Sequence, residues 1–193
     1  MMYGMKIGCA ALAIVSQAAG FVPSAVARGA LRSTGSAQGV SSTALRMVSV
    51  GQVPPDFKLN NQNDKPVSLS SFKNKKKVVV FFYPKDSTPG CTKEARTFQA
   101  DLAQFKKAGA EVIGISSDAD HSAFVQENNL SMTLLSDIGG KVRKEWKVKG
   151  AVFGTIDGRV TYVLDKKGVV TSMYDNLLDG AAHSKEALKA LGA

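Results

Sequence analysis

The sequence predicts an α/β fold in which a central mixed β-sheet is flanked by helices. Two short runs of apolar, β-branched and aromatic residues, 78–83 and 111–116, have the composition of buried strands. Each run is followed by a segment whose apolar residues recur at helical spacing. A predicted hairpin and a last helix then complete the order strand, helix, strand, helix, hairpin, helix.

The segment before the first buried strand is expected to be extended and to contain a turn. Residues 51–59 read as extended chain, and residues 60–65 have the composition of a hairpin turn. Residues 69–72 lead into 73–77, where four of the five positions are lysine. We expect these lysines to form a solvated turn before the strand rather than a ligand site.

The helices are predicted from the spacing of apolar residues and from residues that are typical of helix ends. An amphipathic helix is expected after Cys91, because apolar residues recur three or four positions apart until Gly109 ends the pattern. A second helix is predicted over 120–129, opened by Asp120 as its cap. The remaining predicted elements are a strand at 133–135, a helical turn at 141–146, hairpin strands at 160–164 and 169–174, and a helix at 183–191. This order of elements is typical of a thioredoxin-like fold.

The composition fits one such domain preceded by an extension. Of the 193 residues, 44% are hydrophobic and 21% are charged. The first 47 residues contain four basic residues and no Asp or Glu, whereas residues 48–193 hold 21 basic and 16 acidic residues. The net charge of +5 in the domain is a weak argument for nucleic-acid binding, and no basic helix with interleaved aromatic residues supports it.

Residues 1–47 have the features of a bipartite targeting presequence. In 1–20, one lysine precedes an apolar run and a small-residue exit, as in a secretory signal, and the run is too short to span a bilayer. Residues 21–47 are rich in Ser, Ala, Gly and Arg, which is typical of a transit peptide. The stretch 18–23 resembles the junction in presequences of algae with secondary plastids. We expect delivery to the plastid stroma with no membrane anchor in the mature form; secretion, a mitochondrial destination and a disordered tail are the alternatives.

The chain has two cysteines, and only one lies in the predicted domain. Cys9 falls within the apolar part of the predicted signal, so removal of the presequence would leave Cys91 as the only thiol. A single cysteine cannot form an intramolecular disulfide, which excludes a disulfide-stabilised secreted scaffold. His121 and His183 are far apart, give no zinc-ligand spacing and are expected at the surface or at helix caps. No metal and no cofactor is expected.

Cys91 stands where a buried strand has just ended and a helix is about to begin. Pro84, Pro89 and Gly90 break regular structure between the two elements. A thiol at a helix N-terminus faces free backbone N–H groups and the positive end of the helix dipole. Both favour thiolate over thiol, and the thiolate is the nucleophile. The sequence therefore predicts a reactive cysteine.

A longer motif surrounds this cysteine, Pro84-x-x-x-Thr88-x-x-Cys91 within Phe-Tyr-Pro-Lys-Asp-Ser-Thr-Pro-Gly-Cys-Thr-Lys-Glu-Ala. It resembles that of the peroxiredoxin Q family, also called the bacterioferritin comigratory protein group. The resemblance runs from about Val50 to the C-terminus and includes Val-Ile-Gly-Ile-Ser, Leu-Leu-Ser-Asp and Arg-Val-Thr-Tyr-Val-Leu-Asp further along. It implies a thiol-dependent peroxidase with a thioredoxin-like fold. Thioredoxin itself is disfavoured, because no second cysteine completes Cys-x-x-Cys.

The resemblance assigns roles to four residues. Cys91 would attack a peroxide oxygen and become a sulfenic acid. The Thr88 hydroxyl would hydrogen-bond the thiolate and the peroxide, and Pro84 would shape and shield the pocket. Arg159 would stabilise the thiolate and the charge that develops as the O–O bond breaks. Taken singly, each residue has a structural interpretation. Thr88 could be a helix cap, and Pro84 could simply end a strand. Arg159 could be an exposed hairpin residue, and Cys91 could be a small residue of the core.

One position departs from the family pattern. Many members carry a resolving cysteine five residues after the peroxidatic one, and this chain has Arg96 there. Resolution is then expected from an external thiol: glutathione with glutaredoxin, thioredoxin or another small thiol. Arg96 would also attract an anionic thiol such as glutathione. Glu94, Arg143 and Trp146 are interpreted as structural residues.

The resemblance leaves substrate and assembly open. The expected substrates are hydrogen peroxide and organic hydroperoxides, and the expected form is a monomer, with a Cys91-linked dimer as an alternative. Two other functions compete with a peroxidase, a peroxide sensor or relay and a holdase-type chaperone with residual peroxidase activity. A chaperone would not need the set formed by Pro84, Thr88, Cys91 and Arg159.

Overall fold

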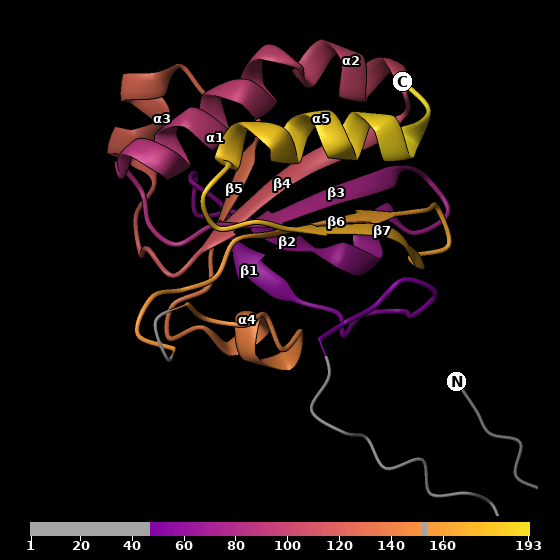
Figure 1. Ribbon diagram of the computed structural model, residues 1–193, viewed down its shortest axis with the longest axis horizontal. Coiled ribbons are helices and arrows are strands. Elements are labelled where there is room, and N and C mark those ends of the chain that lie inside the picture. The colour runs from indigo at the N-terminus through magenta and orange to yellow at the C-terminus, as the bar shows by residue number, and fades with distance from the viewer. Residues whose placement is uncertain (1–46, 152–153) are drawn as a thin grey trace, which may run out of the picture. The chain divides into compact units, whose positions relative to one another are not determined.

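The computed structural model describes residues 47–151 and 154–193. A five-stranded mixed sheet lies at the centre of these residues, with helices on both of its faces (Figure 1). The predicted α/β fold class is therefore confirmed. The predicted presequence, with its signal part at 1–20 and transit-like part at 21–47, lies outside the described residues except for Met47, as does Cys9.

The sheet has the strand order β5-β4-β3-β6-β7. β3 occupies the centre, parallel to β4 and antiparallel to β6. A smaller two-stranded sheet precedes it, and its strands β1 and β2 are joined by residues 61–65, within the turn predicted over 60–65. The bounds are β1 (Lys58–Asn60), β2 (Pro66–Ser68), β3 (Lys77–Phe82), β4 (Ala110–Ser116), β5 (Thr133–Ser136), β6 (Val160–Leu164) and β7 (Val170–Asp175), with a 3-10 helix η1 (Leu69–Phe72) after β2.

Side chains of β3 alternate between two cores, one on each face of the sheet. Val79 and Phe81 belong to the core beneath the long helices, and Val78, Val80 and Phe82 belong to the core on the opposite face. All five side chains are at most 3% exposed, so β3 is buried on both faces. This explains why the strand reads as a continuous apolar run.

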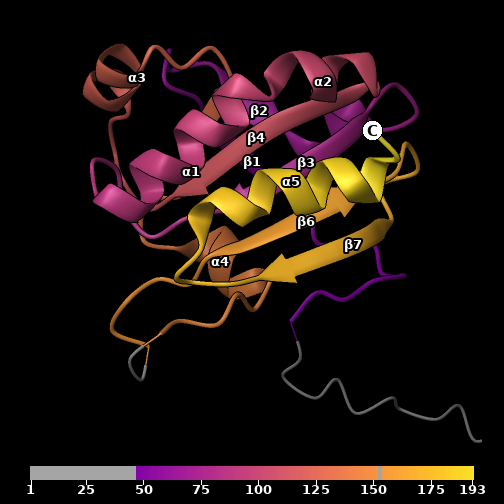
Figure 2. The same cartoon turned by 45° about the horizontal axis from the view of Figure 1, so that its top comes forward.

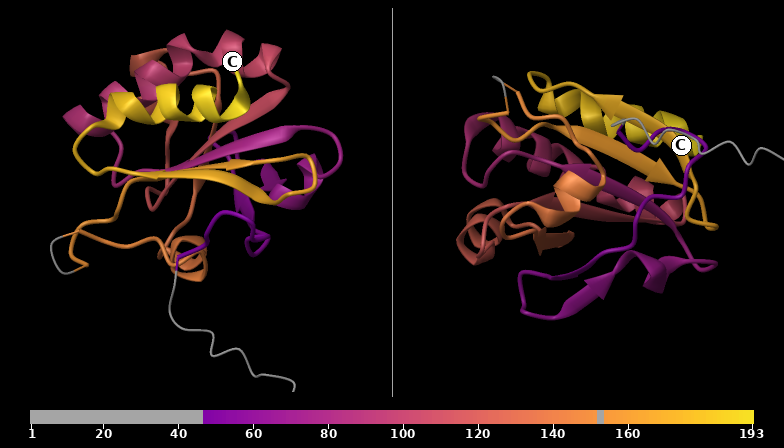
Figure 3. Two further views of the ribbon diagram at one scale, coloured as in Figure 1. Left: turned by 45° about the vertical axis from the view of Figure 1, so that its right-hand side comes forward. Right: turned by 90° about the horizontal axis from the view of Figure 1, so that it is seen from below.

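Four helices cover one face of the sheet and one short helix lies on the other. α1 (Pro89–Ala100) and α5 (Gly180–Leu191) lie side by side, with α2 (Leu102–Lys107) continuing from α1 (Figure 2). α3 (Ser122–Asn128) follows β4. α4 (Lys141–Glu145) lies on the opposite face, near β1 (Figure 3). No helix within the described ranges is long and apolar enough to cross a membrane.

The helix predicted from Cys91 to Gly109 is in fact two helices. The break falls at Asp101, whose Oδ2 accepts a hydrogen bond of 2.6 Å from Ser184 Oγ on α5. Apolar spacing continues through the break, because Phe98, Leu102 and Phe105 all reach the same core. A tertiary contact thus interrupts the helix without changing the side it buries.

Candidate active site

The loop between β3 and α1 places Cys91 in the first turn of α1. Thr88 is the N-cap residue, in an extended conformation with φ −81° and ψ 146°, and Pro89 begins the helix. Cys91 is therefore the third helical residue, at the end where backbone N–H groups lack helical partners. The predicted location of the thiol is correct.

Arg159 meets the Cys91 sulfur from another part of the chain. Its Nη2 donates a hydrogen bond to Cys91 Sγ across 3.4 Å, and both residues are buried, at 4% and 2% exposure. Arg159 immediately precedes β6, whose first residue, Val160, pairs with Phe82 at the end of β3. The antiparallel register therefore delivers the arginine to the sheet edge where the cysteine loop starts.

The other two guanidinium nitrogens fix the orientation of Arg159. Nε donates to the Leu177 carbonyl at 3.0 Å, and Nη1 donates to Glu94 Oε2. Glu94 lies one turn after Cys91 on α1 and is fully buried. Burial raises the pKa of Glu94 to about 8, although the charge and hydrogen bond of Arg159 oppose the shift. The structural interpretation of Glu94 is thus incomplete, because its carboxyl group holds the arginine that faces the sulfur.

His183 lies behind Glu94, and the expected surface or cap position is wrong for it, because it is buried within α5. It is fully buried; its Nε2 donates to the Asn176 carbonyl at 2.8 Å, and its Nδ1 accepts from the Thr161 hydroxyl at 2.8 Å. Nδ1 also lies 3.6 Å from Glu94 Oε1. Burial lowers the pKa of His183 to about 4, with the nearby Arg159 charge acting in the same direction. A neutral imidazole on α5 therefore connects the Thr161 hydroxyl of β6 to the Asn176 carbonyl and lies against the Glu94 carboxyl group.

The second histidine, His121, is also buried and supports the cysteine loop. Asp86 lies in that loop, and its carboxylate accepts from the Tyr83 hydroxyl at 2.7 Å and pairs with His121 Nδ1 at 2.7 Å. The expected surface position is wrong for His121, but the expected cap position is correct, because His121 is the N-cap residue of α3, although its side chain makes no cap hydrogen bond. Burial lowers the pKa of His121, but the Asp86 hydrogen bond and charge outweigh burial, and the net shift is upward. Ser87 follows with a left-handed φ of 57°, a conformation that its neighbours must hold in place.

Thr88 and Pro84 are near the site but make different contacts from those expected. The Thr88 hydroxyl donates to the Lys85 carbonyl at 3.1 Å, and Thr88 makes no hydrogen bond to Cys91 Sγ in the part of the chain that the structure describes. The Thr88 hydroxyl, expected to hydrogen-bond the Cys91 sulfur, is therefore engaged within the short turn before α1. Pro84 is half-buried at the end of β3, where Arg143 donates from Nη2 to the Tyr83 carbonyl and from Nη1 to the Gly158 carbonyl, each at 2.7 Å. Arg143 thus joins the strand ends on which the site stands.

An open groove runs along the exposed side of α1. Its volume is about 500 Å³, and Pro89, Thr92, Lys93 and Arg96 are among the residues that line it. The Arg96 guanidinium donates from Nε to Asn128 Oδ1 at 2.8 Å, so this side chain is held beside the groove by α3. In residues 47–151 and 154–193, no group of three His, Cys, Asp or Glu residues is arranged to hold a metal ion.

Comparisons with known proteins agree with this geometry. The sequence model of the AhpC/TSA family matches residues 50–173. Peroxiredoxin Q, chloroplastic, from Populus jackii is 52% identical over 158 residues, which cover 81% of this chain and 74% of that protein.

Solved structures give the same result. The crystal structure of peroxidoxin BcpB from Mycobacterium tuberculosis has a TM-score of 0.69 and 33% identity over 75% of this chain and 97% of its own. The bacterioferritin comigratory protein of Xanthomonas campestris has a TM-score of 0.64 and 29% identity over 70% and 90%. The thioredoxin-like fold is therefore confirmed, and the chain belongs to the AhpC/TSA family and, within it, to the peroxiredoxin Q group.

Proposed function

We propose that this peroxiredoxin is a one-cysteine thiol peroxidase with Cys91 as its peroxidatic nucleophile. The observation that carries the proposal is the Arg159 guanidinium, 3.4 Å from Cys91 Sγ in the first turn of α1. A fixed cation and a helix N-terminus both favour the anionic form of sulfur over the thiol. Glu94 and the Leu177 carbonyl hold that cation in its orientation.

In the first step, the Cys91 thiolate attacks one peroxide oxygen and the O–O bond breaks. The sulfur loses two electrons and becomes a sulfenic acid, and the departing oxide takes a proton to leave as water or an alcohol. Arg159 is placed to stabilise the negative charge that moves from the sulfur to the leaving oxygen. Pro84 and Thr88 would border the peroxide, with Thr88 acting after its hydroxyl leaves the Lys85 carbonyl.

In the second step, an external thiol condenses with the sulfenic acid, releasing water and leaving a mixed disulfide. A second thiol then displaces Cys91 and restores its thiolate. Cys91 is the only cysteine among the described residues, and Cys9 belongs to the predicted presequence. The 2% exposure of Cys91 means that the first turn of α1 must open before a protein thiol can reach the sulfur. The same burial favours a monomer over a Cys91-linked dimer.

The proposed substrates are hydrogen peroxide and organic hydroperoxides, and the proposed compartment is the plastid stroma. Alkyl peroxide reduction activity is attributed to the Xanthomonas campestris protein, and the plant relatives are named chloroplastic. The acid-free stretch at 1–47 supports import by a presequence. Thioredoxin and glutathione with glutaredoxin are the two reductant systems to compare.

The test is peroxide consumption by the purified chain, with glutathione and glutaredoxin in one assay and thioredoxin in another. Turnover with either system, lost in Cys91→Ser, would support the one-cysteine mechanism and identify the reductant class. Oxidation of Cys91 without turnover in either assay would favour a peroxide sensor or relay, which shares only the first step. A chain whose Cys91 resists peroxide altogether would overturn the catalytic assignment and leave a holdase-type chaperone as the alternative.

A further inference from the structure

The cysteine loop between β3 and α1 is held to the rest of the domain at Asp86. The Asp86 backbone N–H donates to Asp118 Oδ2 at 2.9 Å, just after β4. Its carboxylate accepts from the Tyr83 hydroxyl at 2.7 Å and pairs at 2.7 Å with Nδ1 of His121, the N-cap residue of α3. The Thr88 hydroxyl, in contrast, donates to a carbonyl within the same loop. Asp86 therefore connects the loop to the ends of β4 and α3.

Two carboxylates and one imidazole meet at this point. Neither Asp86 nor Asp118 forms an ion pair with a lysine or arginine in the ranges that the structure describes. The His121 side chain is fully buried, and that of Asp86 is 11% exposed. Charges interact more strongly in such a place than at the surface, because water is largely excluded. The charge of His121 therefore matters for how firmly Asp86 is held.

The surroundings of His121 favour its protonated form. The groups around the imidazole are three carboxylates, one backbone carbonyl and one phenol, from Asp86, Asp118, Asp120, Leu135 and Tyr83. Burial alone lowers the pKa of His121, but the Asp86 hydrogen bond and charge oppose it, and the net pKa lies above 6.5. The pKa of Tyr83 is raised well above 10 by burial, so the phenol stays neutral. The Asp86 pair is thus complete below pH 6.5 and weakens as pH rises through the pKa of His121.

The residue after Asp86 has an unfavourable backbone conformation. Ser87 has a left-handed φ of 57°, which the contacts of its neighbours must hold in place. Thr88 follows as the N-cap residue of α1, and Cys91 lies in the first turn of that helix. Release of Asp86 would let Ser87 return to an ordinary φ. Because the N-cap is the next residue, the first turn of α1 would move with it.

We propose that His121 is a positioning residue that acts through Asp86: its protonated form keeps the cysteine loop and the first turn of α1 in place, and loss of the proton lets them open. Rising pH would then expose the Cys91 sulfur, which is 2% exposed in the structure. The effect on turnover rests on the proposed one-cysteine function, since opening would give an external thiol access to oxidised Cys91. The effect on the loop does not depend on that function.

The experiment is alkylation of Cys91 by iodoacetamide in the full chain, followed by peptide mass spectrometry at pH values on both sides of 6.5. The rate in each variant is divided by the rate in the unaltered chain at the same pH, so that the titration of the thiol itself cancels. His121→Gln should react about tenfold faster below pH 6.5, because a hydrogen bond to a charged group is lost. The ratio should fall toward one as His121 of the unaltered chain loses its proton. A ratio that is constant with pH would overturn the proposal.

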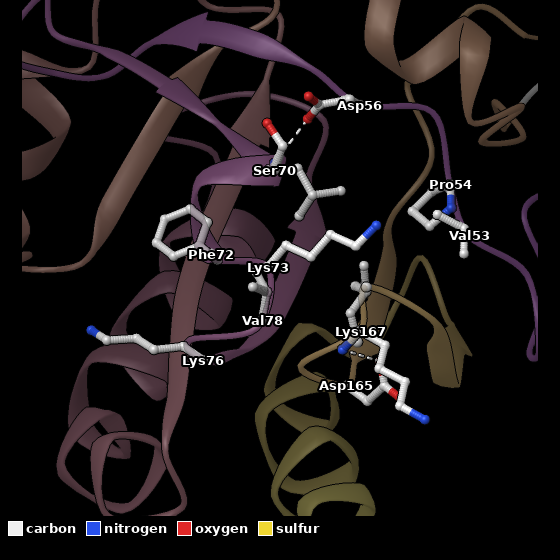
Figure 4. A pocket seen from close by; sticks show the side chains of 13 residues that line it. Val53, Pro54, Asp56, Ser70, Phe72, Lys73, Lys76, Val78, Asp165 and Lys167 are labelled. Carbon is white, nitrogen blue, oxygen red and sulfur yellow. Dashed lines mark hydrogen bonds between the residues drawn. The ribbon is translucent and has the colours of Figure 1, made fainter.

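Asp86→Asn tests the pair from its other side and keeps the shape of the side chain. We expect the same pH-dependent ratio, and the double variant Asp86→Asn/His121→Gln should react no faster than either single variant. Additive effects would show that His121 does not act through Asp86. The matched control is Asp165→Asn, in a pocket beside the start of β3, at the opposite end of the sheet (Figure 4). The Asp165 carboxylate also accepts two hydrogen bonds, at 2.8 and 2.9 Å, and its ratio should be one at every pH.

A second measurement follows the imidazole directly by nuclear magnetic resonance. His121 should remain protonated above pH 6.5 in the unaltered chain and should lose its proton at lower pH in Asp86→Asn. Titration of His121 below pH 6.5 in the unaltered chain would overturn the proposal. Tyr83→Phe removes a neutral hydrogen bond to the same carboxylate, so it should change the alkylation rate by a factor that does not vary with pH.

The two measurements also separate this proposal from the proposed function. Thermal melting verifies that each variant is folded. Neither alkylation nor the titration of His121 requires peroxide or a reductant. Absence of peroxidase turnover, with both pH profiles as expected, would therefore count against the one-cysteine function and leave the role of His121 standing.

Discussion

Gly180 and Gly90 bring the first turns of α5 and α1 into direct backbone contact. A Cβ placed on Gly180 would lie 2.8 Å from the Gly90 carbonyl oxygen and 3.3 Å from Arg159 Nη1. A side chain at this point would clash first with the Gly90 carbonyl and would also press on the guanidinium group that faces Cys91. The position of Arg159 therefore depends on Gly180, which has no side chain. Gly180 belongs to α5, a helix that contributes no group to the proposed chemistry.

Gly180→Ala is expected to move α5 away from α1 and to displace Arg159. Overpacking of this kind costs about 1–3 kcal/mol of stability. The second-order rate constant for Cys91 oxidation by peroxide should fall at least tenfold, as measured by stopped-flow. Ala181→Ser adds an atom at the next, half-buried position and should leave the rate unchanged. An oxidation rate for Gly180→Ala equal to that of the unaltered chain would show that Arg159 does not depend on this contact.

Arg159→Lys should be nearly as inactive as Arg159→Ala. The guanidinium contacts Cys91 Sγ, Glu94 and the Leu177 carbonyl through three different nitrogens, which one ammonium group cannot reproduce. We expect each variant to lose about 100-fold in the rate of Cys91 oxidation, a typical loss for one charge-stabilising donor. Arg96→Lys, at an exposed arginine on the same helix, is the control. Substantial rescue by Arg159→Lys would reduce the role of Arg159 to that of a simple positive charge.

Arg96→Ala should weaken the reductant step while leaving the peroxide step intact. Arg96 lines the groove on the exposed side of α1 and is held there by Asn128. Exposed charge pairs contribute up to about 1 kcal/mol, so we expect KM for glutathione to rise about fivefold. Lys107→Ala, on α2 and outside the groove, should have no effect. Full glutathione-dependent turnover in Arg96→Ala would remove Arg96 from the reductant site.

The contribution of His183 to stability should fall on acidification, because the imidazole is buried in its neutral form. Its pKa is lowered to about 4 in the folded chain, against 6.5 in its ordinary state. This contribution is complete above pH 6.5 and is lost as pH falls toward 4, a change of roughly 3 kcal/mol in the free energy of unfolding. His183→Gln should remove this loss on acidification, as measured by urea titrations at several pH values.

Glu94 acts in the opposite sense and provides the control for that measurement. Its pKa is raised from 4.5 to about 8, so its contribution is complete below pH 4.5 and is lost as pH rises through 8. Glu94→Gln should therefore flatten the curve between pH 6.5 and 8 and, below pH 6.5, leave the loss caused by His183 unopposed. Identical acid slopes in the unaltered chain and in His183→Gln would contradict the burial of a neutral imidazole.

Gly114→Ala should destabilise the sheet without touching the site. A Cβ on Gly114 would lie 2.6 Å from Phe81 Cζ and 2.7 Å from Leu134 Cδ2, both in neighbouring strands. We expect a loss of about 1–3 kcal/mol in urea unfolding. Ile113→Val, at the next residue of β4, should cost about 0.5–1.5 kcal/mol and serves as the reference. A midpoint for Gly114→Ala equal to that of the unaltered chain would show that Phe81 can move aside.

The sequence predicts the sheet better than it predicts the site. The burial of a strand such as 78–83 can be predicted from its own composition. The position of Cys91 follows from a strand, a turn and a helix start that are adjacent in the chain. The pairing of Arg159 with Cys91 bridges 68 positions and was expected only from family resemblance. No local pattern indicates which arginine the β3–β6 register delivers to the cysteine loop.

The missed residues share one physical cause. Glu94, His183 and Gly180 look like ordinary helix residues, and their roles arise only where α1 and α5 lie side by side. From the sequence alone, a buried carboxyl group or imidazole looks like a surface group unless its partner is known. The spacing of apolar residues indicates which face of a helix is buried, but not which element packs against that face. The break at Asp101 has the same origin, since the Ser184 hydroxyl that it accepts comes from α5.

The burial of β3 on both faces also separates two kinds of motion. The cysteine loop begins only after the last paired residue of β3, so the first turn of α1 can unwind while every rung of the central ladder stays intact. Exposure of the sulfur is then a fluctuation of one helical turn rather than a partial melting of the domain. Substitutions in the sheet should shift the melting temperature. Substitutions in the cysteine loop should change the rate at which the reductant reacts with oxidised Cys91.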